Sequence, residues 1–179
     1  MRWLALLLLT FILPHAQATD VTICYNYGCA TEAVVELTSL DLNQLDALFD
    51  DIETAASERV SISLAIGLLN TIAGAQTPVR HDRGGNMDDA GVDGRMDCID
   101  HSTTATRYLN LMQARGLLRF HEVQVPAHRA PYLVNDHWAA RIEEKATAED
   151  YVVDAWFFDN GQPAAVMPLG DWMKGKDPQ

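Results

Sequence analysis

A polar, glycine-rich stretch divides this 179-residue chain into two parts with different periodicity. Residues 75–96 contain four glycines, one proline and several aspartates, which is typical of a loop. Before this loop, apolar residues recur mainly at helical spacing, and after it one helical segment precedes three strand-like segments. Helices and strands that are segregated along a chain in this way predict an α+β domain.

Residues 1–18 have the features of a secretory signal peptide. Arg2 precedes an apolar run that is shorter than the ~20 residues of a membrane span, and the small residues Ala16 and Ala18 follow. We expect cleavage after Ala18, which leaves residues 19–179 as one exported domain, periplasmic or secreted, without a membrane span. An uncleaved anchor is the alternative.

The chain is strongly acidic. Removal of residues 1–18, whose one charged residue is Arg2, changes the formal net charge from −12 to −13. This charge argues against nucleic acid or an anionic membrane surface as a partner.

The first part of the domain predicts a hairpin followed by helices. Residues 21–38 contain two β-branched, apolar runs around a turn with Gly28, which favours a β-hairpin. Residues 40–74 predict one or two helices that end near Gly74. We expect their periodic apolar side chains to pack in the core, namely Leu42, Leu45, Leu48, Phe49, Ile52, Val60, Leu64, Leu68 and Ile72.

The chain has three cysteines. Cys24 and Cys29 lie close together in the predicted hairpin, and they are either a disulfide or two small buried residues. If they pair, Cys98 is a free thiol, which is unusual in an exported protein. A thiol–disulfide exchange protein would need a resolving cysteine close to Cys98, and the sequence has none there.

Cys98 begins a predicted helix over residues 97–115. Asp97 is a suitable N-cap and Gly116 a suitable C′ residue. The apolar face of this helix consists of Ala105, Tyr108, Leu109 and Met112. A thiol in the first turn lies at the positive end of the helix dipole, which favours the reactive thiolate. Cys98 is therefore a candidate nucleophile, and a buried structural cysteine is the alternative.

A cysteine nucleophile needs an imidazole to take its proton and a third group to orient that imidazole. His137 opens the strand-like segment 137–144, and Asp154 lies in the apolar segment 150–158, where an unpaired carboxylate would be costly. A hairpin between the two segments would bring Asp154 close to His137, whereas a register shift of one residue would separate them.

Other pairings remain open at this point. Asp154 could pair with Arg141, and His101, one turn after Cys98, is a second candidate base that has no obvious orienting carboxylate. We expect the remaining histidines of the domain to lie at the surface, namely His81, His121 and His128.

Three segments resemble motifs of the bacterial transglutaminase-like cysteine proteinases, within the papain-like and transglutaminase-like superfamily. These are "DCID" around Cys98, "HWAARI" from His137 and "YVVDAWF" around Asp154, and the resemblance covers residues 94–158. It implies a papain-like α+β fold in which the nucleophile helix packs on an antiparallel sheet. It also implies Cys98 as nucleophile, His137 as base and Asp154 as the orienting group.

The implied activity is cleavage of peptide or isopeptide bonds in envelope proteins or cell-wall peptides, with acyl transfer to an amine as a variant. Exported members of that family include periplasmic proteases that clip cell-surface adhesins. No cofactor is required by this chemistry. We expect the Cys98 backbone N–H to be the first oxyanion donor, and Asn86 and Trp138 are candidates for oxyanion or substrate contacts.

Some adhesin-clipping members bind calcium through acidic residues beside the cysteine. Asp97 and Asp100 match these positions, whereas Ile99 stands where an acidic residue is usual. Calcium is therefore an alternative that we do not favour. The loop offers further oxygen ligands in Asp82, Asp88, Asp89 and Asp93.

The alternative function is a non-catalytic periplasmic binding module with the same fold. In that case the loop and several aromatic residues would form a partner surface, namely Trp138, Trp156, Phe157 and Trp172. We expect the polar tail, residues 170–179, to be frayed.

Overall fold

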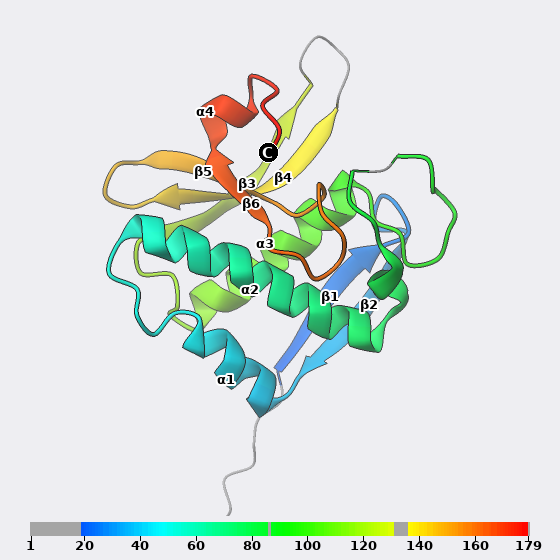
Figure 1. Cartoon of the computed structure of the whole chain (residues 1–179), viewed down its shortest axis with the longest axis horizontal. Coiled ribbons are helices and arrows are strands. Elements are labelled where there is room, and N and C mark those ends of the chain that lie inside the picture. The colour runs from blue at the N-terminus through cyan, green and yellow to red at the C-terminus, as the bar shows by residue number, and fades with distance from the viewer. Residues whose placement is uncertain (1–18, 86, 131–135, 179) are drawn as a thin grey trace, which may run out of the picture.

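The computed structural model describes residues 19–85, 87–130 and 136–178. The predicted signal peptide, residues 1–18, and the candidate Asn86 lie outside the described residues. In chain order the elements are β1 (Thr19–Tyr25), β2 (Thr31–Leu37), α1 (Ser39–Ala47), α2 (Ala55–Gln76), the 3₁₀ helix η1 (Pro78–His81), α3 (Cys98–Ala114), β3 (His121–Arg129), β4 (His137–Glu144), β5 (Glu149–Asp154), β6 (Ala165–Pro168) and α4 (Leu169–Trp172). This is the α+β class that the sequence predicts (Figure 1).

The predicted hairpin is present as β1 and β2, which pair antiparallel with Ile23 opposite Ala33. Alternate side chains of β1 are buried because one face of the hairpin covers the core. Cys24 and Cys29 form a disulfide across the connection between the strands, which confirms the paired interpretation of these cysteines.

The helical part contains two helices, and each begins at a threonine N-cap with a capping box, Thr38 for α1 and Thr54 for α2. The prediction that Val60 and Leu64 pack in the core is wrong, since they are 61% and 43% exposed. The buried stripe of α2 instead consists of Ile62, Ala65, Ile66, Leu69 and Ala73. Both stripes are apolar, so helical spacing alone did not identify the face that packs.

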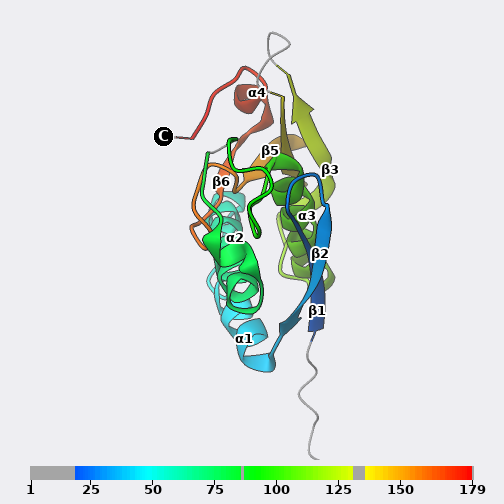
Figure 2. The ribbon, with the colours of Figure 1, turned by 90° about the vertical axis from the view of Figure 1, so that its right-hand side faces the viewer.

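Helix α3 follows the prediction closely. Asp97 is its N-cap, Arg115 its C-cap, and Gly116 adopts the positive φ of 74° that a C′ residue often needs. The four predicted apolar residues of its face are buried. Figure 2 shows α3 between α2 on one side and, on the other, β3 and the hairpin, whose strand β1 contacts α3.

The second sheet is antiparallel with the order β3-β4-β5-β6, and α3 packs against it. Ala140 and Val153 contribute to the main core, whereas their neighbours Ala139 and Val152 pack with Trp172 on the opposite face. The register of β3 shifts between Gln124 and Ala127, around a proline that has no N–H for the ladder. Both faces of the central strands are therefore covered.

Two features of the last third differ from the prediction. The strand expected over residues 150–158 ends at Asp154, and the chain turns at once through residues 155–158. The tail is not simply frayed, because β6 and α4 precede its end and Trp172 is fully buried. None of the helices within the described residues has the length and apolar character needed to cross a bilayer.

Candidate active site

Cys98 is the first residue of α3 and is half-buried. The first turn is held by a capping box, in which Asp97 Oδ1 accepts the Asp100 N–H at 2.9 Å and Asp100 Oδ2 accepts the Asp97 N–H at 3.2 Å. The N–H groups of a first helical turn have no intrahelical acceptor. The Cys98 N–H is thus suited to binding an oxyanion.

The strand register brings His137 and Asp154 together. Ala140 of β4 pairs with Val153 of β5, so Asp154 lies beside Ala139 and shares a sheet face with His137. His137 Nε2 lies 2.7 Å from Asp154 Oδ2, and the side chains are only 6% and 2% exposed. Arg141, the other predicted partner, pairs instead with Asp150 at 3.2 Å.

His137 also forms a hydrogen bond with the Cys98 side chain. Because Nε2 is engaged by Asp154, Nδ1 is the ring nitrogen left to face the thiol. Burial lowers the pKa of His137, but the hydrogen bonds to Asp154 and Cys98, with the charges of both, outweigh it and raise this pKa from 6.5 to about 9. At neutral pH the imidazole of His137 is therefore protonated.

The carboxylate of Asp154 has two further donors. Trp172 Nε1 donates to Oδ2 at 3.1 Å, and the Trp156 backbone N–H donates to Oδ1 at 3.2 Å. Every oxygen of this buried carboxylate is thus engaged, which keeps it oriented toward His137. Sequence reasoning gave Trp172 no such role, because only the fold brings α4 to the end of β5.

Aromatic rings surround the imidazole of His137. Its ring centroid lies 4.9 Å from that of Trp156, 5.4 Å from Phe157 and 5.7 Å from Trp172. A cavity of about 150 Å³ opens here, lined by Met87, Arg129, Asp136, His137, Trp156, Phe157, Gly175 and Asp177. The site therefore has a small, partly aromatic recess beside His137.

The candidate Trp138 lies elsewhere. It follows His137 in β4, so its side chain projects from the opposite face of the strand. Its ring stacks on His128 at a centroid distance of 4.5 Å, and Trp138 is not among the residues that line the cavity.

His101, the competing base, has a carboxylate partner that the sequence did not suggest. His101 Nε2 lies 2.9 Å from Asp82 Oδ2, and both side chains are buried. Asp82 Oδ1 also accepts the backbone N–H of Met96 at 2.9 Å. This pair fastens the residues just before Cys98 to α3.

The other histidines match the expectation in two of three cases. His81 and His128 are exposed. His121 is not at the surface, because it is fully buried with its Nδ1 2.9 Å from Glu58 Oε1. From the sequence alone, His121 at the start of a strand cannot be told from a surface histidine, because nothing local indicates its contact with Glu58.

Five of the six carboxylates considered for calcium have protein partners, namely Asp82, Asp89, Asp93, Asp97 and Asp100. Asp97 and Asp100 accept backbone N–H groups, as does Asp82. In the loop, Asp89 pairs with Arg95 at 2.8 Å, and Asp93 accepts from Asn26 at 3.2 Å. Within the described ranges, no group of three or more His, Cys, Asp or Glu side chains is arranged to hold a metal ion.

No protein-family model, no curated protein and no solved structure matches this chain. The function is therefore inferred from the geometry of the site and from the resemblance of the three motifs.

Proposed function

We propose that this chain is an exported cysteine hydrolase that cleaves peptide or isopeptide bonds. The observation that carries the proposal is the hydrogen-bonded series Cys98–His137–Asp154, in which a helix-terminal thiol, an imidazole with a pKa of about 9 and a buried carboxylate lie in contact. This is the arrangement of an activated thiol nucleophile.

The chemistry follows from the positions of these groups. The Cys98 thiolate attacks the carbonyl carbon of an amide, and the Cys98 N–H stabilises the oxyanion that forms. The His137 imidazolium gives its proton to the amine as the carbon–nitrogen bond breaks, which leaves a thioester. His137 then takes a proton from water, and the resulting hydroxide attacks the thioester, which releases the acid and restores the Cys98 thiolate beside a protonated His137. An amine in place of water would give acyl transfer.

The three motifs also support a finer proposal on the fold and the family. A nucleophile helix packed on an antiparallel sheet, with His and Asp on successive strands, is what a papain-like or transglutaminase-like fold would require. Membership of the bacterial transglutaminase-like cysteine proteinases remains part of the proposal. The signal-like residues 1–18 and the disulfide suit an envelope protein or cell-wall peptide as the substrate.

A binding module with an inactive site is the rival function, and the aromatic recess around His137 would serve it equally well. The two functions differ in the reactivity of Cys98. Cys24 and Cys29 are bonded to each other, so an alkylating agent added to the intact protein reports on Cys98 alone.

The test is the rate of Cys98 alkylation by iodoacetamide as a function of pH, in the wild-type protein and in His137→Ala. Activation predicts rapid reaction well below the ordinary thiol pKa of ~8.5, lost in His137→Ala. His128→Ala is the matched control, since His128 is an exposed histidine of the same sheet. Slow reaction that is the same in all three proteins would favour the binding module.

A further inference from the structure

The connection between β1 and β2 has an unusual backbone. Asn26, Tyr27, Gly28 and Cys29 have consecutive φ angles of 68°, 66°, 64° and 56°. L-residues other than glycine disfavour this left-handed region, and a run of them needs external support. We call these four residues the left-handed turn.

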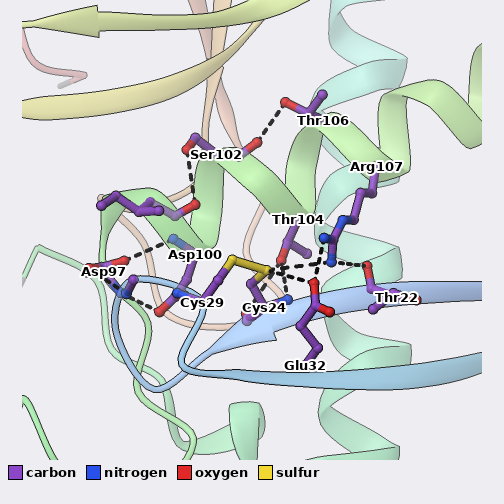
Figure 3. Close-up of a disulfide and its surroundings, with 12 residues drawn as sticks. Thr22, Cys24, Cys29, Glu32, Asp97, Asp100, Ser102, Thr104, Thr106 and Arg107 are labelled. Carbon is purple, nitrogen blue, oxygen red and sulfur yellow. Dashed lines mark hydrogen bonds and ion pairs between the residues drawn. A yellow bond between two sulfur atoms is a disulfide. The ribbon is translucent and has the colours of Figure 1, made fainter.

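The left-handed turn directs its backbone N–H groups at the two carboxylates that flank Cys98. Tyr27 N donates to Asp100 Oδ2 at 2.8 Å, and Cys29 N donates to Asp100 Oδ1 at 2.6 Å. Gly28 N donates to Asp97 Oδ2 at 2.9 Å. Three successive amides thus bind the capping box of α3, and Figure 3 shows both aspartates directed toward this loop.

The same turn also holds the chain that leads into α3. Asn26 N donates to the Arg95 carbonyl at 2.7 Å, and Gly94 N donates to Asn26 Oδ1 at 2.8 Å. The nucleophile therefore lies between two anchored segments, residues 94–97 before it and Asp100 after it.

Asp100 depends on these donors. Its side chain is fully buried, and burial raises its pKa against the effect of the Cys29 N–H bond. Without the turn amides a buried carboxylate would lose most of its partners, so it would either take up a proton or move toward water. Either change would alter the first turn of α3.

The disulfide closes the left-handed turn. It joins Cys29, the last residue of the turn, to Cys24 in β1, whose N–H donates to Thr104 Oγ1 of α3 at 2.9 Å (Figure 3). Cys24 is buried but Cys29 is half-buried, so the Cys29 sulfur is the one that a reductant would reach first.

We infer that the disulfide-closed turn is a positioning element for Cys98, so that the reactivity of the nucleophile depends on the oxidised state of Cys24–Cys29. The inference rests on the proposed function. In the reducing step, one thiolate of a dithiol attacks Cys29 Sγ and breaks the disulfide, and its second thiol displaces Cys29. The products are the oxidised, cyclic dithiol and the free thiols of Cys24 and Cys29.

The test uses the variant Cys24→Ser/Cys29→Ser, in which Cys98 is the one remaining cysteine. We expect its alkylation at about pH 6 to be roughly tenfold to a hundredfold slower than in the wild-type protein, with similar rates at about pH 10, because misplacement of a reacting group has effects of this size. Asp100→Asn should show the same selective loss of the Cys98 alkylation rate at low pH. An effect on stability alone would not change the pH profile of that rate.

Two controls separate positioning from instability. Leu45→Ala removes a buried side chain from α1 and lowers stability without touching the turn, so its low-pH reactivity should be unchanged. In the wild-type protein, dithiothreitol followed by peptide-resolved mass spectrometry should show loss of Cys98 reactivity, with recovery on reoxidation. The serine variant should not respond to dithiothreitol.

The outcomes for the two proposals are distinct. If the oxidised wild-type protein shows no His137-dependent reactivity, the proposed function fails. If that reactivity is present but persists in the serine variant and in the reduced protein, only the positioning role is wrong. Global unfolding of the reduced protein, seen by circular dichroism, would also overturn the positioning role.

Discussion

The indole of Trp172 donates to Asp154 Oδ2, which is the same carboxylate oxygen that faces His137 Nε2. One oxygen therefore serves two donors from two different elements, and the ring of Trp172 also covers the imidazole at a centroid distance of 5.7 Å. A carboxylate held in this way has little freedom to rotate away from His137.

Removal of the indole N–H should take one hydrogen bond from Asp154 while an aromatic ring still fills the position of Trp172. We expect Trp172→Phe to slow the alkylation of Cys98 at about pH 6 by roughly fivefold to tenfold, because a hydrogen bond to a charged group contributes about 1.5 kcal/mol. Trp138→Phe is the control, since Trp138 lies outside the cavity and should leave the rate unchanged. Equal rates for the two variants would mean that Trp172 only fills space.

Loss of charge at Asp154 should change the titration of His137. The pKa of His137 is about 9, and the hydrogen bond and charge of Asp154 are major causes of this value. We expect Asp154→Asn to bring the pKa of His137 below about 8, since a neighbouring opposite charge accounts for one or more pKa units. An NMR titration of the His137 ring protons measures it. A value that stays near that of the wild-type protein would show that Cys98 supplies most of the effect.

The pH dependence of activity should have an alkaline limb near pH 9. Above the pKa of His137 the imidazolium is lost, and with it the acid that protonates the departing amine. A rate of amide turnover that stays constant well above pH 9 would exclude His137 as that acid.

The same shift predicts the direction of a stability change. The pKa of His137 is higher in the folded state, about 9, than its ordinary value of 6.5. Its stabilisation is therefore complete below pH 6.5 and is lost as the pH rises through 9. Urea unfolding of the wild-type protein and of His137→Gln should show a difference in unfolding free energy that shrinks between these two pH values.

The buried pair of Glu58 and His121 should govern acid stability. Burial of Glu58 raises its pKa, but the hydrogen bond from His121 and those from the backbone of residues 119–121 outweigh burial and lower it below 4.5. The stabilisation from ionised Glu58 is thus present above pH 4.5 and is lost as the pH falls through the pKa of Glu58 in the folded state. We expect Glu58→Gln to cost about 3–5 kcal/mol in urea unfolding at neutral pH. The exposed Glu53→Gln is the control, and equal effects would contradict the assignment.

Much of the fold was predictable because local patterns and tertiary packing agree. The hairpin, the caps of α3 at Asp97 and Gly116, and the strand that begins at His137 all follow from short-range rules. The contact between His137 and Asp154 was predictable only as one of two registers, since a shift of one residue would have placed them on opposite faces.

The remaining features depend on long-range contacts that have no local signal. The face of α2 that packs could not be read from an apolar helix, and the buried state of His121 depends on a glutamate 63 residues away. The partner of His101 is likewise Asp82, in a loop where several aspartates look alike. Trp172 looked like part of a polar tail because its partner lies on another element.

The positions that build the site extend from Tyr27 to Trp172, so they span nearly all of the described chain. Contacts of such large sequence separation form late in folding, because the entropy of closing a long loop is lost before the contacts it allows can stabilise the chain. A chain that is only partly synthesised, or whose domain is locally unfolded at one edge, therefore has Cys98 without an oriented His137 imidazole. On the proposed function, the site would be complete only in the folded domain, which would spare neighbouring polypeptides, and other copies of this chain, from premature attack.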